Sequence, residues 1–112
     1  MDQLLDKSFD FSIRIMELAK YLDEERKPYP LSSRLLTCAA GIGISLRLAG
    51  LTGRRSAESL EQALSCAVES EYLLEIMVKT DCLQERQSIP ILSDCRVLKE
   101  LIAEQLSRKN QK

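Results

Sequence analysis

The chain has 112 residues and a formal net charge of -1, and 45% of its residues are hydrophobic. This length predicts one domain with a single core over residues 1–112, and the charge excludes a basic footprint for nucleic acid over the chain as a whole. Histidine is absent, which removes Ser-His-Asp and Cys-His nucleophile sites and the ordinary catalytic metal sites. We therefore expect a protein that is not an enzyme, with no metal, no cofactor and no small-molecule substrate that the sequence identifies.

The ends of the chain and its cysteines bear on localisation. The opening MDQLLDKSFD has neither the basic region nor the apolar region of a signal peptide. The chain also contains no run of about 18 uncharged apolar residues that could span a membrane. The four cysteines contain no CxxC pair, so we interpret them as small hydrophobic residues in a reducing compartment. These features predict a cytoplasmic protein without a membrane partner.

The first expected element is a helix over 8–24, with Ser8 as its N-cap. Its apolar residues cover more than half of the circumference. One side carries Phe9, Ile13 and Met16, and another carries Phe11, Ile15, Leu18 and Leu22. The prolines at 28 and 30 end this element, because a proline cannot continue a helix.

The second expected helix covers 31–49 and contains the glycine-rich stretch TCAAGIGISLRLAG. That stretch has neither the third glycine of GxGxxG nor the lysine of a phosphate-binding loop, and its apolar run is short and carries Arg47. Its periodicity instead predicts a helix whose small residues, Gly41 and Gly43 among them, let neighbouring helices approach closely. Two apolar faces again cover a wide arc, which comprises Leu35, Leu36, Cys38, Ala40, Ile42, Ile44, Leu46 and Ala49.

Two further helices are expected over 56–79 and 87–108, the first opened by Ser56. Glu71 lies in the middle of the apolar arc of the third helix, where an unpaired charge is expensive, so it needs a cationic partner. Arg34, on a narrow strip of small and polar residues of the second helix, is the predicted partner and would form a buried structural pair with it. Four helices with short connections predict an all-α protein, a single antiparallel up-down-up-down bundle.

The apolar arcs of the first two helices are wider than an isolated bundle requires. Each spans nearly 200°, whereas a stripe a little over 100° wide is enough to face one core. Contiguous apolar surface of this extent is rarely left to water, so the sequence predicts that a second copy of the chain covers it.

Basic residues are concentrated in the second quarter of the chain. Residues 31–57 contain four arginines and no acid, whereas residues 58–87 contain seven acids and two bases. A local nucleic-acid surface would have to use Arg47, Arg54 and Arg55, or Arg108 and Lys109 near the C-terminus. The alternative is that these side chains are solvated helix ends, which the acidic total favours.

The stretches LSSRLLTCAAGIGISLRLA and ESEYLLEI, with FDFSIRIMELAKYL before them and LSDCRVLKELI after, resemble the bacterial "four helix bundle protein" family. That family includes proteins encoded within intervening sequences of 23S rRNA genes and is related to the accessory variability protein of diversity-generating retroelements. The chain departs from the family pattern on the polar strip. Arg34 replaces glutamine, Thr37 arginine, Ser45 asparagine and Leu48 glutamate.

The resemblance implies a non-enzymatic four-helix protomer that assembles into a homopentameric ring. In the retroelement relative, such a ring binds nucleic acid and a reverse transcriptase. Two functions therefore stay open for this chain. One is a homo-oligomeric scaffold or adaptor that binds proteins through apolar grooves, and the other is an accessory protein that binds RNA or DNA with a reverse transcriptase.

Overall fold

A computed structural model of the chain describes residues 3–24, 30–51 and 56–110. These residues form four helices and no strand: α1 (Gln3–Glu24), α2 (Pro30–Leu51), α3 (Ala57–Lys79) and α4 (Glu85–Asn110). The predicted all-α class with four helices is confirmed. The ends of the helices lie within two residues of the expected ones, except the start of α1, which lies at Gln3 and not at residue 8.

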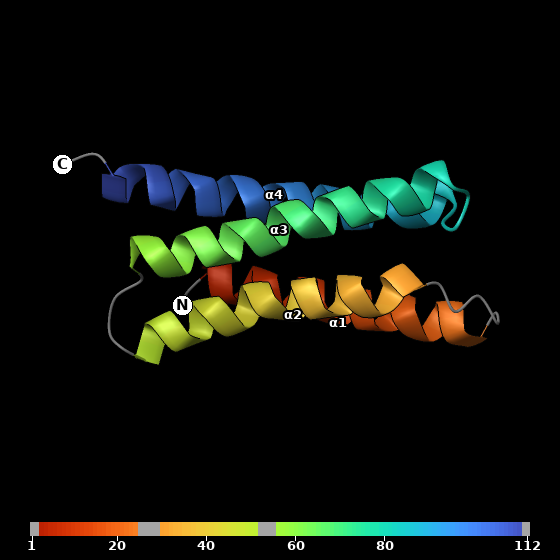
Figure 1. Cartoon of the computed structure of the whole chain (residues 1–112), viewed down its shortest axis with the longest axis horizontal. Helices are drawn as coiled ribbons and strands as arrows, with labels where there is room; N and C mark the ends of the chain where they lie inside the picture. Colours follow the sequence, from red (N-terminus) through yellow and green to blue (C-terminus); the bar gives the residue numbers. More distant parts are fainter. Residues whose placement is uncertain (1–2, 25–29, 52–55, 111–112) are drawn as a thin grey trace.

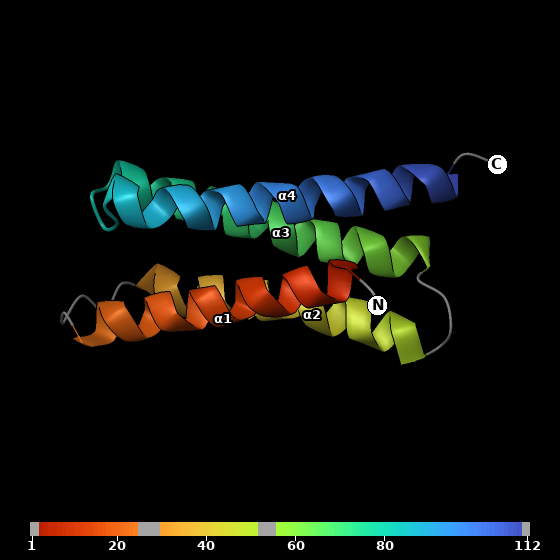
Figure 2. The same cartoon turned by 180° about the vertical axis from the view of Figure 1, so that it is seen from behind.

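The helices lie side by side along an elongated molecule with extents of 48 × 23 × 23 Å. Figures 1 and 2 show that each helix runs back along the direction of the one before it, so the ends of α2 and α4 lie at the same end of the molecule. Each helix packs against two others in the cyclic order α1, α2, α3, α4, and the contact between α1 and α4 is the least extensive.

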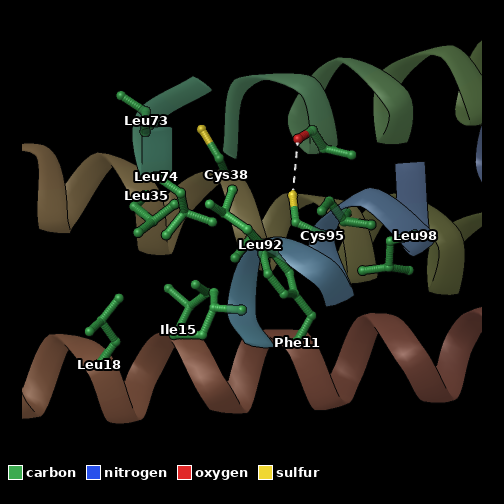
Figure 3. Close-up of a cluster of buried hydrophobic side chains, with 14 of the residues drawn as sticks. Phe11, Ile15, Leu18, Leu35, Cys38, Leu73, Leu74, Leu92, Cys95 and Leu98 are labelled. Atoms are coloured by element: carbon green, nitrogen blue, oxygen red, sulfur yellow. Dashed lines mark hydrogen bonds between the residues drawn. The ribbon is translucent and has the colours of Figure 1, made fainter. Parts of the chain in front are cut away.

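The core is filled mainly by aliphatic side chains from all four helices, with the ring of Phe11 among them, in agreement with the low aromatic content. Figure 3 shows Phe11 and Ile15 of α1 pointing towards Leu92 of α4 and Leu35 of α2. The inner arc of each helix is buried, including Phe11, Ile15, Leu18, Leu22, Leu35, Ile42, Leu46, Leu60, Leu74, Met77, Leu98 and Ile102. Burial of this aliphatic surface is the main favourable contribution to folding.

Two helix ends differ from the sequence-based expectation. Ser8 is not an N-cap: α1 begins at Gln3, and Ser8 is buried inside it with its hydroxyl donating to the Leu5 carbonyl at 2.9 Å. Pro90 lies in the second turn of α4, because the helix begins at Glu85, two residues before its expected start. Ser56 does cap α3, because its hydroxyl accepts a hydrogen bond from the Ser59 amide at 3.1 Å.

The small residues of α2 serve close packing, as predicted, but unequally. A Cβ at Gly41 would lie 2.9 Å from the sulfur of Cys66 on α3, which is closer than van der Waals contact allows. A Cβ at Gly43 would lie 3.6 Å from the Ser8 hydroxyl, an ordinary contact. A methyl group at Gly41 would therefore require the Cys66 side chain to shift.

By length and composition alone, Ser32–Leu51 of α2 is apolar enough to cross a membrane, although it contains Arg34 and Arg47 and is therefore not an uncharged run. Its apolar character has an explanation within the fold. Leu35, Ile42 and Leu46 are at most 1% exposed because they face the centre of the bundle. The core helix of a four-helix bundle reaches this composition without a bilayer.

Candidate functional site

The outer surfaces of α1 and α2 form an apolar groove, which we call the α1–α2 groove. It consists of Phe9, Ile13 and Met16 of α1 with Ala40, Ile44 and Arg47 of α2. Phe9, Ile13 and Met16 are 44–50% exposed and Ile44 is 64% exposed, whereas the opposite faces of both helices are buried. Both wide apolar arcs are thus divided by the fold into an inner face in the core and an outer face in solvent.

The centre of the groove is hollowed. A shallow cavity of about 200 Å³ lies between the two helices and is lined by Ser8, Phe9, Ser12, Ala40, Gly43, Ile44 and Arg47. Beneath the cavity, Ser12 of α1 contacts α2. Its hydroxyl is within hydrogen-bonding distance of the Ser8 carbonyl of α1, at 3.0 Å, and of the Ala39 carbonyl of α2, at 3.2 Å. The small residues at 40 and 43 leave the hollow open, and the apolar walls suit an aliphatic or aromatic side chain.

Arg47 closes one end of the groove. Its guanidinium carbon lies 5.1 Å from the centre of the Phe9 ring, a distance at which the ring quadrupole attracts a cation. No ion pair joins Arg47 to another residue in the described part of the chain. The groove therefore combines an apolar floor with a positive charge that is held in place but not neutralised.

The predicted pair between Arg34 and Glu71 is wrong. Glu71 accepts hydrogen bonds from Arg96 and Lys99 of α4, both at 2.9 Å, and its side chain is 14% exposed. Glu71 is largely enclosed and paired with cations, as expected. Its position on α3, however, faces α4 and not α2. The hydrogen bond from Lys99, aided by Arg96, lowers the pKa of Glu71 despite the opposing effect of desolvation.

Arg34 instead pairs with Glu69, two residues before the expected partner and on the side of α3 that faces α2. The Cys38 thiol donates to the same Glu69 carboxylate at 3.0 Å. The hydrogen bond from Arg34 lowers the pKa of Glu69. Sequence reasoning missed Glu69, although an acid on the α2-facing side of the third helix was the signal that could have identified it.

The cysteines do not form a nucleophilic or metal-binding site in the described residues. All four are free, and Cys38 and Cys95 are buried, as expected for small hydrophobic residues. Burial raises the pKa of Cys38 to about 11 and that of Cys95 to about 12, so both are protonated at neutral pH. No group of three potential metal ligands occurs in the part of the chain that the structure describes.

The candidate nucleic-acid residues do not form one described patch. Arg47 is engaged with Phe9, and Arg108 pairs with Glu104 on its own helix. Arg54 and Arg55 lie outside the described residues. Because α2 and α4 end at the same end of the molecule, Arg47 and Lys109 lie towards that end on different helices (Figure 1).

These features define the chain as an all-α four-helix bundle protein with an exposed apolar groove. No family model and no curated protein matches the sequence. Among solved structures, the chain is similar to a protein of unknown function of the S23 ribosomal protein family from Bacteroides thetaiotaomicron. The two are 30% identical with a TM-score of 0.86, and the match covers 92% of this chain and 97% of that one.

The chain belongs to the S23 ribosomal protein family. This identification agrees with the resemblance carried by stretches of all four helices, and the match likewise covers nearly the whole bundle. The relative is itself of unknown function, so membership defines the fold and leaves the activity to be argued from the surface of this chain.

Proposed function

We propose that this chain is a non-enzymatic scaffold or adaptor protein that associates with copies of itself and binds protein partners through the surface of the assembly. The observation that carries the proposal is the α1–α2 groove. It leaves four large apolar side chains, Phe9, Ile13, Met16 and Ile44, 44–64% exposed, and Phe9 and Ile44 line the same cavity. Surfaces of this kind are typical of protein–protein interaction sites.

The pentameric ring implied by the family resemblance is the assembly that we propose, and the cytoplasm is the compartment. The free cysteines support the cytoplasm as the compartment, because disulfides persist in oxidising compartments and thiols in reducing ones. The exposed apolar groove supports the ring, because a closed homo-oligomer buries the same apolar surface on every copy.

Light scattering coupled to size exclusion tests the proposal directly. The expected result is an assembly of several chains at micromolar concentration, with five copies as the favoured stoichiometry. A folded protein that remains a monomer over the whole concentration range would refute self-association and with it the scaffold role.

A second candidate function is nucleic-acid binding with RNA or DNA and a reverse transcriptase. It is supported by the position of Arg47 and Lys109 towards the same end of the molecule, where an assembly would multiply their charges. Binding of structured RNA and of duplex DNA, measured at two salt concentrations, tests it. Phosphate-driven binding must weaken steeply as salt rises, and Lys109→Glu should weaken it further. Binding that is absent at low salt would eliminate this candidate.

A further inference from the structure

The contact between α1 and α4, which we call the α1–α4 seam, is built differently from the rest of the bundle. It is the least extensive of the four contacts between neighbouring helices. The contact between α2 and α3 is close by comparison, because a Cβ at Gly41 would lie 2.9 Å from the Cys66 sulfur. The side of α1 that faces α4 is a series of residues at intervals of three and four, most of them charged: Lys7, Asp10, Arg14, Glu17 and Tyr21.

Two cavities lie along the α1–α4 seam, so its packing is incomplete. Both are lined by Arg14 of α1. The smaller, of about 210 Å³, is lined also by Asp94 of α4, and the larger, of about 470 Å³, also by Leu18 of α1 and Ile91 of α4. Leu18 and Ile91 are 7% and 8% exposed, whereas Leu74 of α3 is completely buried. Side chains that border such openings lack partner atoms on one side, so van der Waals contacts stabilise the seam less than they stabilise the core.

An ion pair crosses the seam at Arg14, the residue that both cavities share. Its Nη1 atom lies 3.1 Å from Oδ2 of Asp94, and the two side chains are 47% and 45% exposed. Water screens an ion pair this exposed, so it contributes little to holding the helices together. Asp10 and Glu17 lie about one turn before and after Arg14 on α1 and attract the same guanidinium. The ion pair can therefore break at small cost.

We propose that the bundle opens along the α1–α4 seam while the contact between α2 and α3 stays closed, and that the ion pair between Arg14 and Asp94 limits this opening. Parts of a protein with few buried contacts open at a lower free energy than the whole. In the opened form the helices stay folded, and the apolar core that α1 covers is exposed to solvent. The inference concerns a single chain and does not depend on the proposed self-association.

Cys95 provides a probe of the opening in the unmodified chain. It lies on α4, is completely buried, and its thiol donates to the Ala67 carbonyl of α3 at 3.5 Å. Figure 3 shows Phe11 of α1 pointing towards the same part of α4. Separation of α1 from α4 therefore uncovers Cys95. Cys38 is buried between α2 and α3, where its thiol donates to Glu69, so it should stay protected.

Alkylation of the native thiols by iodoacetamide, followed by peptide mass spectrometry, measures the opening. The rate at Cys95 should rise with urea less steeply than global unfolding followed by circular dichroism, because opening of the seam exposes only part of the surface that unfolding exposes. Cys38 should follow the steeper dependence of global unfolding. A dependence on urea at Cys95 that is equal to or steeper than the one at Cys38 overturns the proposal.

A double-mutant cycle tests the role of the ion pair. Arg14→Gln should raise the rate of alkylation at Cys95 about two- to fivefold, the range expected for loss of an exposed ion pair, and leave the rate at Cys38 unchanged. In an Asp94→Asn background the same substitution should have no effect, because the ion pair is already broken. Lys20→Gln, which removes a cation at an exposed position of α1 outside the seam, is the matched control and should react as the wild type does.

Three results overturn the role of the ion pair: no change at Cys95, an equal increase at Cys95 and Cys38, or an equal increase in both backgrounds. Circular dichroism confirms that each variant is folded.

Discussion

At the scale of single residues, the polar contacts between helices decide which neighbours each helix faces. Glu71 lies between two cations of α4, and Glu69, two residues earlier, lies against Arg34 of α2. Two carboxylates so close in sequence thus face opposite neighbours, because two residues of a helix are separated by about 200°. These contacts help to specify the order of the helices in the bundle.

The lowered pKa of Glu71 makes a testable contribution to stability. A carboxyl group with a depressed pKa in the folded state stabilises the protein above its unfolded pKa of about 4.3, and this contribution is lost as the pH falls through the folded pKa. At pH 7 we expect Glu71→Gln to be less stable by about 1 kcal/mol, a value reduced by the partial exposure of Arg96 and Lys99. Urea unfolding at neutral pH measures the difference.

The pH dependence distinguishes this contact from a loss of packing. The difference in free energy of unfolding between wild type and Glu71→Gln should be constant from neutral pH down to about pH 5 and shrink below about pH 4. Other carboxylates titrate in both proteins, so their effects cancel in the difference. Glu100→Gln, at an exposed position of α4, is the control and should change the free energy of unfolding little at neutral pH. A difference that does not change with pH would exclude the charged contact as its origin.

At the scale of helices, the sequence predicts which residues share one face of a helix better than it predicts which neighbouring helix that face contacts. The 3.6-residue period separated Phe11 and Ile15 of α1 from Phe9 on another side of the helix, and the structure shows the first side buried and the second exposed. It could not place Glu71 against α4 and away from Arg34, because a small rotation of a helix changes which neighbour an edge residue faces. The start of α1 was missed for a related reason: Ser8 has the chemistry of a cap, but its burial inside the helix depends on tertiary packing.

The contact between α2 and α3 can be tested through two glycines of α2. Gly50→Ala should stabilise the protein by about 0.5–1 kcal/mol, because nothing lies within 4 Å of the new methyl group and alanine favours the helix. Gly41→Ala should instead destabilise it by about 1 kcal/mol, since the new methyl group would overlap the Cys66 sulfur at 2.9 Å. Thermal or urea unfolding of the two variants measures both effects.

Removing the sulfur provides the control for this prediction. In a Cys66→Ala background the overlap is gone, so Gly41→Ala should become neutral or stabilising there. If Gly41→Ala already stabilises the wild-type chain as Gly50→Ala does, the close approach of α2 and α3 at this position is not required.

At the scale of the whole molecule, α1 and α2 each contribute one apolar side to the core of the bundle and another to the exposed surface. The inner arcs of α1 and α2 are buried in the core of a single chain, and the outer arcs leave Phe9, Ile13, Met16 and Ile44 exposed. The sequence predicted this excess of apolar surface, because each arc was too wide for one core. It could not predict which side of α1 and α2 would face outwards, because that depends on how the helices are placed in space.

If copies of the chain cover the groove, the stability of the fold must depend on protein concentration. Association that favours the folded state raises the midpoint of thermal unfolding as the chain becomes more concentrated, by mass action. We expect the midpoint of the wild type to rise by several degrees over a hundredfold range, which corresponds to about 1–3 kcal/mol for a domain of this size. Ile44→Asp should instead have a midpoint that is independent of concentration, because a charge in the groove prevents association while the bundle core stays intact. Differential scanning calorimetry or circular dichroism at several concentrations provides the measurement, and a wild-type midpoint that does not move would show that the folded chain gains nothing from other copies.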